Sequence, residues 1–232
     1  MDLYYKQASG FMACGEQGPV RERPRDWLVW HFTHRDNLAE ICSSGSLLPS
    51  SQVQPRRSVA NDRVKSRRTY QVKPDEDYPM STVHDHVPFY IAAKSPMLFV
   101  VTSQGREAYR ADSRDLVFMG VVLGDLADAA LTWCVSDGNA AAAYTQFSRD
   151  LDNLGTFVDF DLLCQRMWNN TPDDPDRQSR RAAECLVLGA VPLDLVRVIV
   201  TRDATGLAEP KRLFNAVGGA RQYHAMRDIF YN

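Results

Sequence analysis

The chain has 232 residues, enough for one large domain or two small ones, and its 44% of hydrophobic residues is ordinary for a globular core. No stretch approaches the roughly 18 apolar residues of a membrane span, and the N-terminus lacks a secretory signal, so we expect no membrane association. Five cysteines without a C-x-x-C spacing indicate a reduced, cytoplasmic protein, and the net charge of −2 does not by itself indicate a nucleic-acid partner.

The first part of the chain predicts one strand and one helix after an irregular lead-in. Residues 1–26 are rich in Gly, Pro and Arg and predict no regular element, whereas Trp27–Thr33 is dense in β-formers and predicts a strand. Thr33 and Asp36 have the spacing of a capping box, and Gly45 is a helix stop. The apolar stripe of this expected helix consists of Leu38, Ile41 and Cys42.

The remaining elements alternate between strands and helices. Pro49–Pro79 is polar and basic, with one surface helix expected near Val59–Arg68. Ser95 and Pro96 suit the start of a helix, although the apolar run after them suits a strand equally well. Runs of β-formers predict strands at Val87–Ala93, Leu116–Leu123, Leu131–Ser136, Ala182–Leu188 and Leu195–Thr201. Helices are predicted at Asn139–Leu151 and Asp159–Trp168. This order favours one α/β or α+β domain.

Glu184 is the one charged residue in an otherwise apolar predicted strand, Ala182–Leu188. Both faces of this strand are apolar apart from Glu184, which is typical of a central strand covered on both sides. An ionised carboxylate is costly there unless a partner compensates it. The local pattern fits two interpretations equally: an ion pair with Arg180 or Arg181, or a catalytic group at a strand end.

Histidines near two predicted strands allow two interpretations. His31 and Thr33 point the same way at a strand-to-helix junction, where they serve either as a satisfied histidine and a helix cap or as ligand-binding groups. His31 with His34, together with His84 and His86, also resembles a set of zinc ligands. We expect no metal, because His31 and His34 point in different directions and no thiolate pair supports a site.

The segment 56–73 carries seven basic side chains against one acid, Asp62. Such a run is usually a solvated face, but it also suits a clamp for the phosphates of a nucleic acid or a dinucleotide. The chain has no Gly-x-Gly-x-x-Gly, no P-loop and no serine nucleophile elbow, so nothing supports a Rossmann or Walker nucleotide site.

Three blocks of sequence together resemble one family. WHFTHRDNLAEI…SGSLL (30–48), HDHVPFYIAAKSPMLFVV (84–101) and RRAAECLV (180–187) are similar to the DarT family of DNA ADP-ribosyltransferase toxins, and WCVSDGNAAAAYTQF (133–147) also fits. The resemblance covers the chain from about Asp26 and is closest to the thymidine-modifying subgroup. It implies an α+β, PARP-like ADP-ribosyltransferase fold over residues 27–232, with a split β-sheet and NAD in the cleft.

The resemblance also implies an activity and partners. The expected reaction transfers ADP-ribose from NAD, used as a co-substrate without a metal, to thymidine in single-stranded DNA, which releases nicotinamide and blocks replication. The expected partner is a macrodomain antitoxin of the DarG type. Two alternatives stay open: a histidine-rich metal-dependent nuclease, and a non-catalytic module that binds single-stranded DNA.

The family pattern assigns roles to particular residues. It implies that Glu184 and Arg68 are catalytic, that residues 49–73 cover NAD, and that residues 139–184 present the substrate base. Asn139 stands where some members carry His, so its role is open. The implied NAD-binding residues are His31, Phe32, Thr33, Asn37, Glu40, Leu48 and Arg68. The basic residues expected to contact DNA are Arg63, Lys65, Arg67, Arg177, Arg180 and Arg181.

The expected chemistry agrees with a carboxylate at position 184. Cleavage of the nicotinamide–ribose bond builds positive charge on the ribose, as glycoside cleavage does, and a carboxylate fixed beside it stabilises that charge. A thymine ring nitrogen must lose its proton before it attacks. A guanidinium stays protonated in proteins, so we expect Arg68 to stabilise the deprotonated base or an NAD phosphate, while Glu184 or water accepts the proton.

Overall fold

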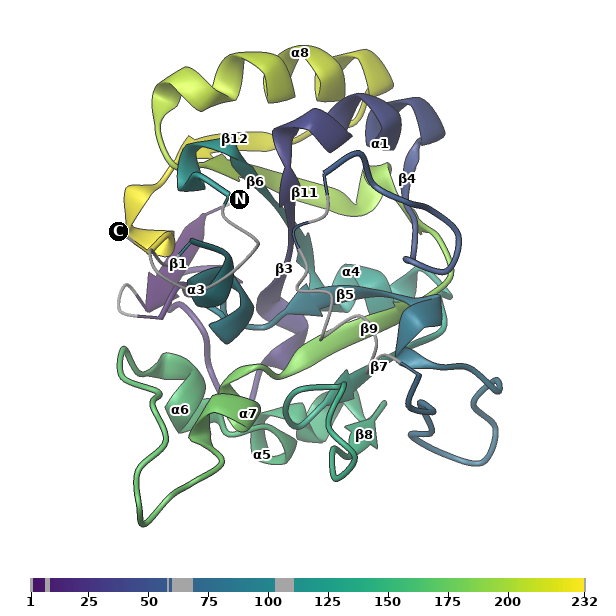
Figure 1. Cartoon of the computed structure of the whole chain (residues 1–232), viewed down its shortest axis with the longest axis vertical. Helices are drawn as coiled ribbons and strands as arrows, with labels where there is room; N and C mark the ends of the chain where they lie inside the picture. The colour runs from purple at the N-terminus through teal and green to yellow at the C-terminus, as the bar shows by residue number, and fades with distance from the viewer. Residues whose placement is uncertain (1, 7–8, 58, 60–68, 103–110, 232) are drawn as a thin grey trace.

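The computed structural model describes residues 2–6, 9–57, 59, 69–102 and 111–231 (Figure 1). The strands are β1 Leu3–Lys6, β2 Phe11–Cys14, β3 Trp27–His34, β4 Ser46–Leu47, β5 His86–Tyr90, β6 Leu116–Val122, β7 Trp133–Ser136, β8 Phe147–Ser148, β9 Glu184–Leu188, β10 Val191–Pro192, β11 Val196–Thr201 and β12 Gln222–Ala225. The helices are α1 Leu38–Ser44, α3 Pro96–Thr102, α4 Leu123–Asp128, α5 Leu154–Phe157, α6 Phe160–Cys164, α7 Arg177–Arg181 and α8 Ala208–Val217.

One large mixed sheet runs through the described part of the molecule, in the order β12-β11-β6-β3-β5-β9-β7-β8, with β2 and then β1 added beside β3. The pairings are antiparallel except that of β11 with β12. A second, small sheet consists of β4 and β10. The sheet is therefore continuous from the C-terminal strand to the strand that begins with Glu184 and beyond it.

The large sheet opens between β3 and β5. These strands share a single paired position, Trp30 with Tyr90, whereas β3 pairs with β6 along seven residues. The main-chain carbonyl of Pro88 points toward β3, and proline has no N–H to offer on the same side, so the ladder cannot continue there. The sequence-based expectation of a split sheet is met by two half-sheets joined at one position.

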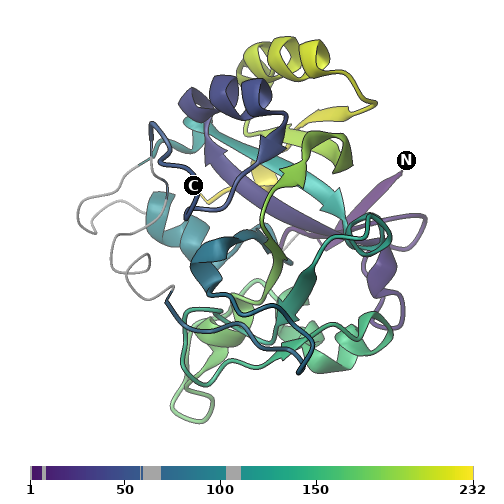
Figure 2. The ribbon, with the colours of Figure 1, turned by 90° about the vertical axis from the view of Figure 1, so that its right-hand side faces the viewer.

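Helices cover the two faces of the sheet unequally. One face forms the largest apolar cluster, which includes Val29 and Cys185 and packs against α1, α4, α5, α6 and α8. The other face, with Trp30 and Tyr90, packs against α3 and the C-terminal segment. Helices α1 and α8 lie side by side at one end, in both Figure 1 and Figure 2. Within the described ranges, no helix has the length and apolar composition needed to cross a bilayer.

Two predicted elements were wrong, and a third was predicted too long. The lead-in 1–26 contains β1 and β2, and Phe11 is fully buried, because this short segment pairs with the sheet in spite of its Gly-rich flanks. The expected helix Asn139–Leu151 is a series of turns followed by β8. There the main-chain oxygen of Asn139 accepts a hydrogen bond from the Thr145 hydroxyl (2.6 Å), a local bond that competes with helix formation. The expected helix Asp159–Trp168 is shorter, since α6 ends at Cys164.

The predicted cap at Thr33 was also wrong, because β3 continues to His34. There Nδ1 of His34 accepts the Asp36 N–H (3.2 Å) and caps the turn before α1. Gly45 ends α1 in the left-handed conformation, as expected. The run after Pro96 is helix α3, and Oγ of Ser95 accepts the Leu98 N–H (3.2 Å) at its first turn. The expected surface helix near Val59–Arg68 falls almost wholly outside the described residues.

Candidate active site

Glu184 is the first residue of β9 and is 4% exposed. Its main-chain N–H donates to Oγ of Ser136 on the neighbouring β7 (3.0 Å). The Ser136 hydroxyl in turn donates to the Gly138 carbonyl (2.7 Å). Ser136 is fully buried, so these bonds fix the main chain at the point where the carboxylate projects. Ser136 could not be predicted from the sequence, because a serine at a strand end has no distinctive spacing.

His31 spans the opening between the two half-sheets. Its Nδ1–H donates to the Pro88 carbonyl on β5 (3.0 Å), which places the proton on Nδ1. Its ring also meets Phe89 edge-on, with centroids 5.9 Å apart. The imidazole is thereby held in one orientation where β3 and β5 separate.

The register places Glu184 close to this opening. Glu184 is opposite Tyr90, and Tyr90 is opposite Trp30, the last position at which β3 pairs with β5. The Cα atoms of Glu184 and Trp30 are therefore two strand spacings apart, about 10 Å. His31 and Thr33 alternate with Trp30 and so project to the other face of β3. Glu184 is in register with Tyr90 and Trp30, so His31 and Glu184 project to opposite faces beside the position where β3 and β5 pair.

Asn37 connects this junction to the start of the basic segment. Its Nδ2 donates to Oγ1 of Thr33 (2.9 Å) and to the Arg57 carbonyl (2.8 Å), and its Oδ1 accepts the Arg57 N–H (2.9 Å). Both amide hydrogens are thus used within the protein, and Asn37 is 4% exposed. Glu40 makes a 2.7 Å ion pair with Arg56 one helical turn further on. These two predicted NAD-binding residues hold the segment that begins at Arg56.

Two other predicted NAD-binding residues lie beside the same junction. Phe32 is 6% exposed, and its ring stacks on Tyr90 and packs against Phe118, so its side chain belongs to the core. Leu48 is half-buried directly after β4. The structure therefore gathers His31, Phe32 and Thr33 on β3, with Asn37 directly after that strand.

Arg181 is buried, which contradicts the prediction that it contacts DNA. Its side chain is 1% exposed and donates to four main-chain carbonyls, and burial lowers its pKa to about 10, which leaves it charged at neutral pH. A side chain with no exposed surface cannot contact a phosphate. The accepting carbonyls belong to Leu162, Leu163, Ser9 and Lys94, at 2.6–3.1 Å.

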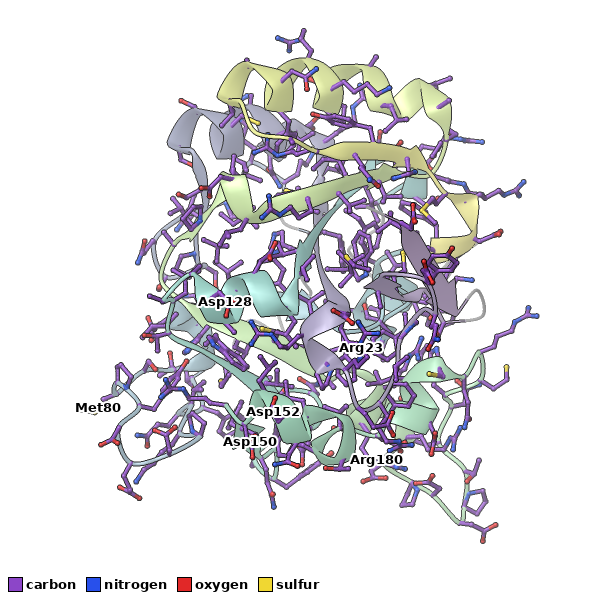
Figure 3. The ribbon with its side chains drawn as sticks, turned by 180° about the vertical axis from the view of Figure 1, so that it is seen from behind. Arg23, Met80, Asp128, Asp150, Asp152 and Arg180 are labelled. Atoms are coloured by element: carbon purple, nitrogen blue, oxygen red, sulfur yellow. The ribbon has the colours of Figure 1, made fainter. Side chains whose placement is uncertain are left out.

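Arg177 and Arg180 are held by acidic residues of the same region. Arg180 makes ion pairs with Asp159, Asp174 and Asp176, the last at 3.0 Å, and its side chain is 31% exposed. It lies at the outer surface in Figure 3. Arg177 lies 3.3 Å from Asp174. Arg180 has these carboxylates as partners and Arg181 has main-chain carbonyls, so the described contacts do not support the predicted ion pair of Glu184 with either arginine.

Four of the predicted basic residues lie outside the described residues: Arg63, Lys65, Arg67 and Arg68. Asn139 follows the Ser136–Gly138 turn, and its N–H donates to the Ser179 carbonyl of α7 (2.9 Å), so it connects the two ends of the segment 139–184. Its Oδ1 accepts the Ala141 N–H (3.0 Å).

The described histidines each have a partner other than a metal. His86 is fully buried between the Tyr78 hydroxyl and the Thr82 carbonyl, and His84 bonds to Ser50. Among the residues that the structure describes, no group of three His, Cys, Asp or Glu is arranged to hold a metal ion. Burial raises the pKa of Cys134 to about 12, so this thiol is not a nucleophile at neutral pH.

A sheet that opens between two central strands, with a buried glutamate beside the opening, agrees with the fold expected of an ADP-ribosyltransferase. The family model described as ssDNA thymidine ADP-ribosyltransferase, DarT, matches residues 30–231. The chain belongs to this DarT family.

Relatives and solved structures agree with this membership. A DNA ADP-ribosyl transferase of Mycobacterium tuberculosis is 54% identical over 228 residues, 98% of each chain. One from Thermus aquaticus is 31% identical over 183 residues, 78% of each chain. The structure of Thermus sp. 2.9 DarT in complex with ADP-ribosylated ssDNA matches with a TM-score of 0.80 and 24% identity, over 90% of this chain and 97% of that one. The NAD+ complex of the same DarT matches with a TM-score of 0.73 and 25% identity, over 88% and 97%.

Proposed function

We propose that this chain transfers ADP-ribose from NAD+ to a thymidine base in single-stranded DNA and releases nicotinamide. The observation that carries the proposal is the buried Glu184, fixed at the edge of the sheet opening in a chain of the DarT family. The Thermus sp. 2.9 relatives were solved with NAD+ and with ADP-ribosylated ssDNA, which supports the same substrates here. Family membership favours this reaction over a metal-dependent nuclease or a non-catalytic DNA-binding module.

In the proposed mechanism, Glu184 stabilises the positive charge that develops on the ribose as the bond to nicotinamide breaks. A carboxylate whose main chain is already fixed by Ser136 needs little reorganisation, which is the condition under which electrostatic stabilisation is strongest. Glu184 or a water molecule then accepts the proton of the thymine ring nitrogen.

The proposed NAD+ site uses the junction after β3. His31 and Thr33 contact the nicotinamide end of NAD+, and Leu48 lines the same side. Phe32 contributes by fixing the strand, since its side chain is occupied in the core. Asn37 and Glu40 anchor the segment 49–73 that covers the co-substrate, through Arg57 and Arg56. Arg68 contacts the deprotonated base or an NAD+ phosphate.

The remaining site proposals concern DNA and the cellular setting. Arg63, Lys65 and Arg67, together with Arg177 and Arg180, are proposed to contact DNA, and residues 139–184, including Asn139, present the base. We further propose that the protein is a cytoplasmic toxin opposed by a macrodomain antitoxin of the DarG type. The solved Thermosipho africanus DarTG in complex with ADP-ribose, matched with a TM-score of 0.66, supports such a pairing.

The test is the mass of oligonucleotides after incubation with the protein and NAD+. A single-stranded oligonucleotide with one thymidine is expected to gain one ADP-ribose, whereas the same sequence with cytidine in that place, or the thymidine strand annealed to its complement, is not. Modification of the thymidine-free strand to the same extent would contradict thymidine as the acceptor. Loss of product on addition of a chelator would instead favour a metal-dependent enzyme.

A further inference from the structure

Three aromatic side chains form a cluster at the surface where α3, the loop after α6 and the C-terminal segment meet. The ring of Phe99 meets Trp168 and Tyr231 edge-on, with centroids 5.7 and 5.2 Å apart. Hydrogen bonds hold the cluster rigidly, because Trp168 Nε1 donates to the Tyr231 hydroxyl (3.0 Å), which itself donates to the Lys94 carbonyl (2.9 Å). Phe99 is 38% exposed and Trp168 is 8% exposed, so Phe99 is the ring of the cluster that faces solvent.

Two cations, Lys94 and Arg166, lie at this cluster. Neither has a carboxylate within 4.0 Å among the described ion pairs, although the charge of Asp228 acts on Lys94. Nζ of Lys94 lies 5.7 Å from the centre of the Tyr231 ring, and Arg166 and Arg181 are close enough to oppose its charge. Arg166 is exposed. Arg166 is one of several described arginines without a carboxylate within 4.0 Å, unlike Arg197, which pairs with Asp125. A surface that combines an exposed aromatic ring with nearby cations is typical of proteins that bind single-stranded nucleic acid.

This surface is joined to the strand of Glu184 by short bonds. The Lys94 carbonyl accepts from Arg181 (3.1 Å), which lies three residues before Glu184, and the Ile91 N–H donates to the Ala183 carbonyl (3.3 Å). In Figure 1, α3, the C-terminus and the helices α6 and α7 that precede β9 lie on the same side of the molecule. A strand of DNA whose thymidine reaches Glu184 would therefore have its neighbouring nucleotides close to the cluster.

We propose that Lys94, Phe99, Arg166, Trp168 and Tyr231 form an aromatic–cationic patch that binds the single-stranded DNA flanking the modified thymidine. Phe99 stacks on a base, and Lys94 and Arg166 contact phosphates on either side of it. The patch holds the substrate and takes no part in bond breaking. This assignment rests on the proposed function, since it names the path of the same DNA substrate outside the catalytic opening.

Two variants, Phe99→Ala and Arg166→Glu, test the patch by fluorescence anisotropy with a labelled 20-nucleotide strand and without NAD+. We expect each to weaken binding about tenfold, and Arg166→Glu to lower the slope of log affinity against log salt concentration by at least one. Arg166→Glu breaks no bond in the described structure, so its effect does not depend on altered folding. The matched control is Arg212→Glu, an exposed arginine of α8 with no ion pair in the described chain, which is expected to bind like the wild type.

Activity assays of the same variants separate the patch from the proposed function. For a 20-nucleotide strand, we expect KM to rise about tenfold with kcat unchanged, whereas a four-nucleotide strand that is too short to reach the patch shows no change. Unchanged 20-nucleotide binding in both variants, or equal weakening by Arg212→Glu, would overturn the patch. Failure of the proposed function appears separately, as the absence of any ADP-ribosylated product with the wild-type protein.

Discussion

Two adjacent arginines, Arg180 and Arg181, show how differently the same side chain is used at successive positions of α7. Arg180 pairs with three carboxylates at the surface, where ion pairs are screened and contribute little. Arg181 is buried and is the common donor to carbonyls from three separate segments. It therefore supports the strand of Glu184 without touching the reaction.

Replacement of Arg181 by Met is expected to lower the free energy of unfolding by at least about 3 kcal/mol, because four main-chain carbonyls lose a charged donor inside the protein. Urea denaturation monitored by circular dichroism measures this change. Arg180→Met is the matched control, and its expected cost is about 1 kcal/mol or less. Equal costs for the two variants would show that Arg181 is not the buried hub that the structure describes.

Ser136→Ala tests whether the fixed main chain of Glu184 contributes to catalysis. The variant leaves the buried Glu184 N–H without its acceptor, which is expected to cost about 1–3 kcal/mol of stability. We also expect kcat to fall more than tenfold with KM for NAD+ little changed, because the carboxylate loses its orientation. Steady-state kinetics measures both constants. A variant that is destabilised yet keeps the wild-type kcat would show that Ser136 serves folding alone.

At the level of secondary structure, the proposed active site lies where β3 separates from β5. Asn37 and Glu40, at the start of α1, anchor the adjoining segment through Arg57 and Arg56. The apolar run of β3 identifies a central strand from sequence, and Glu184 and His31 are recognisable by their neighbours. The position of the opening cannot be recognised from the sequence, because it depends on the register at which Pro88 faces the edge of β3. The anchoring by Asn37 was equally hidden, because it joins residues 20 apart through a side-chain amide.

Asn37→Ala is expected to raise KM for NAD+ about tenfold with a small change in kcat. The variant removes three hydrogen bonds to Thr33 and Arg57 and so releases the first turn of the segment proposed to cover NAD+. Initial rates at varied NAD+ concentration give both constants. Asn215→Ala on α8, which removes one surface bond to Tyr223, is the control and should leave KM unchanged. An unchanged KM in Asn37→Ala would rule out the anchoring role.

His86 makes the end of β5 sensitive to acid. Burial lowers the pKa of His86 below the value near 6.5 of an unfolded histidine. As the pH falls below 6.5, His86 therefore takes up a proton in the unfolded chain before it does so in the folded chain. We expect this histidine to reduce the free energy of unfolding by up to about 1.4 kcal/mol per pH unit until the folded pKa is reached. Urea denaturation from pH 7.5 to 5 should show a shallower pH dependence for His86→Gln. Identical slopes would contradict the assignment.

At the scale of the whole molecule, sequence patterns captured the central strands and failed where distant contacts override local preference. The alanine-rich segment after Asn139 favours a helix by composition, yet it forms turns because its polar side chains bond locally and Phe147 pairs with β7. The N-terminal strands escaped notice because four residues are too few to show a period. Arg181 was assigned to DNA because nothing in RRAAE distinguishes a buried arginine from an exposed one.

Glu184, held at the opening of the sheet, is proposed to catalyse ADP-ribose transfer to thymidine. The most direct measurement is the single-turnover rate of product formation, followed by mass, for wild-type protein and Glu184→Gln with the same single-thymidine strand and saturating NAD+. We predict a loss of at least about a hundredfold with unchanged thermal stability, since one electrostatic stabiliser of the transition state is removed. A Glu184→Gln rate within a few fold of the wild type would contradict the account.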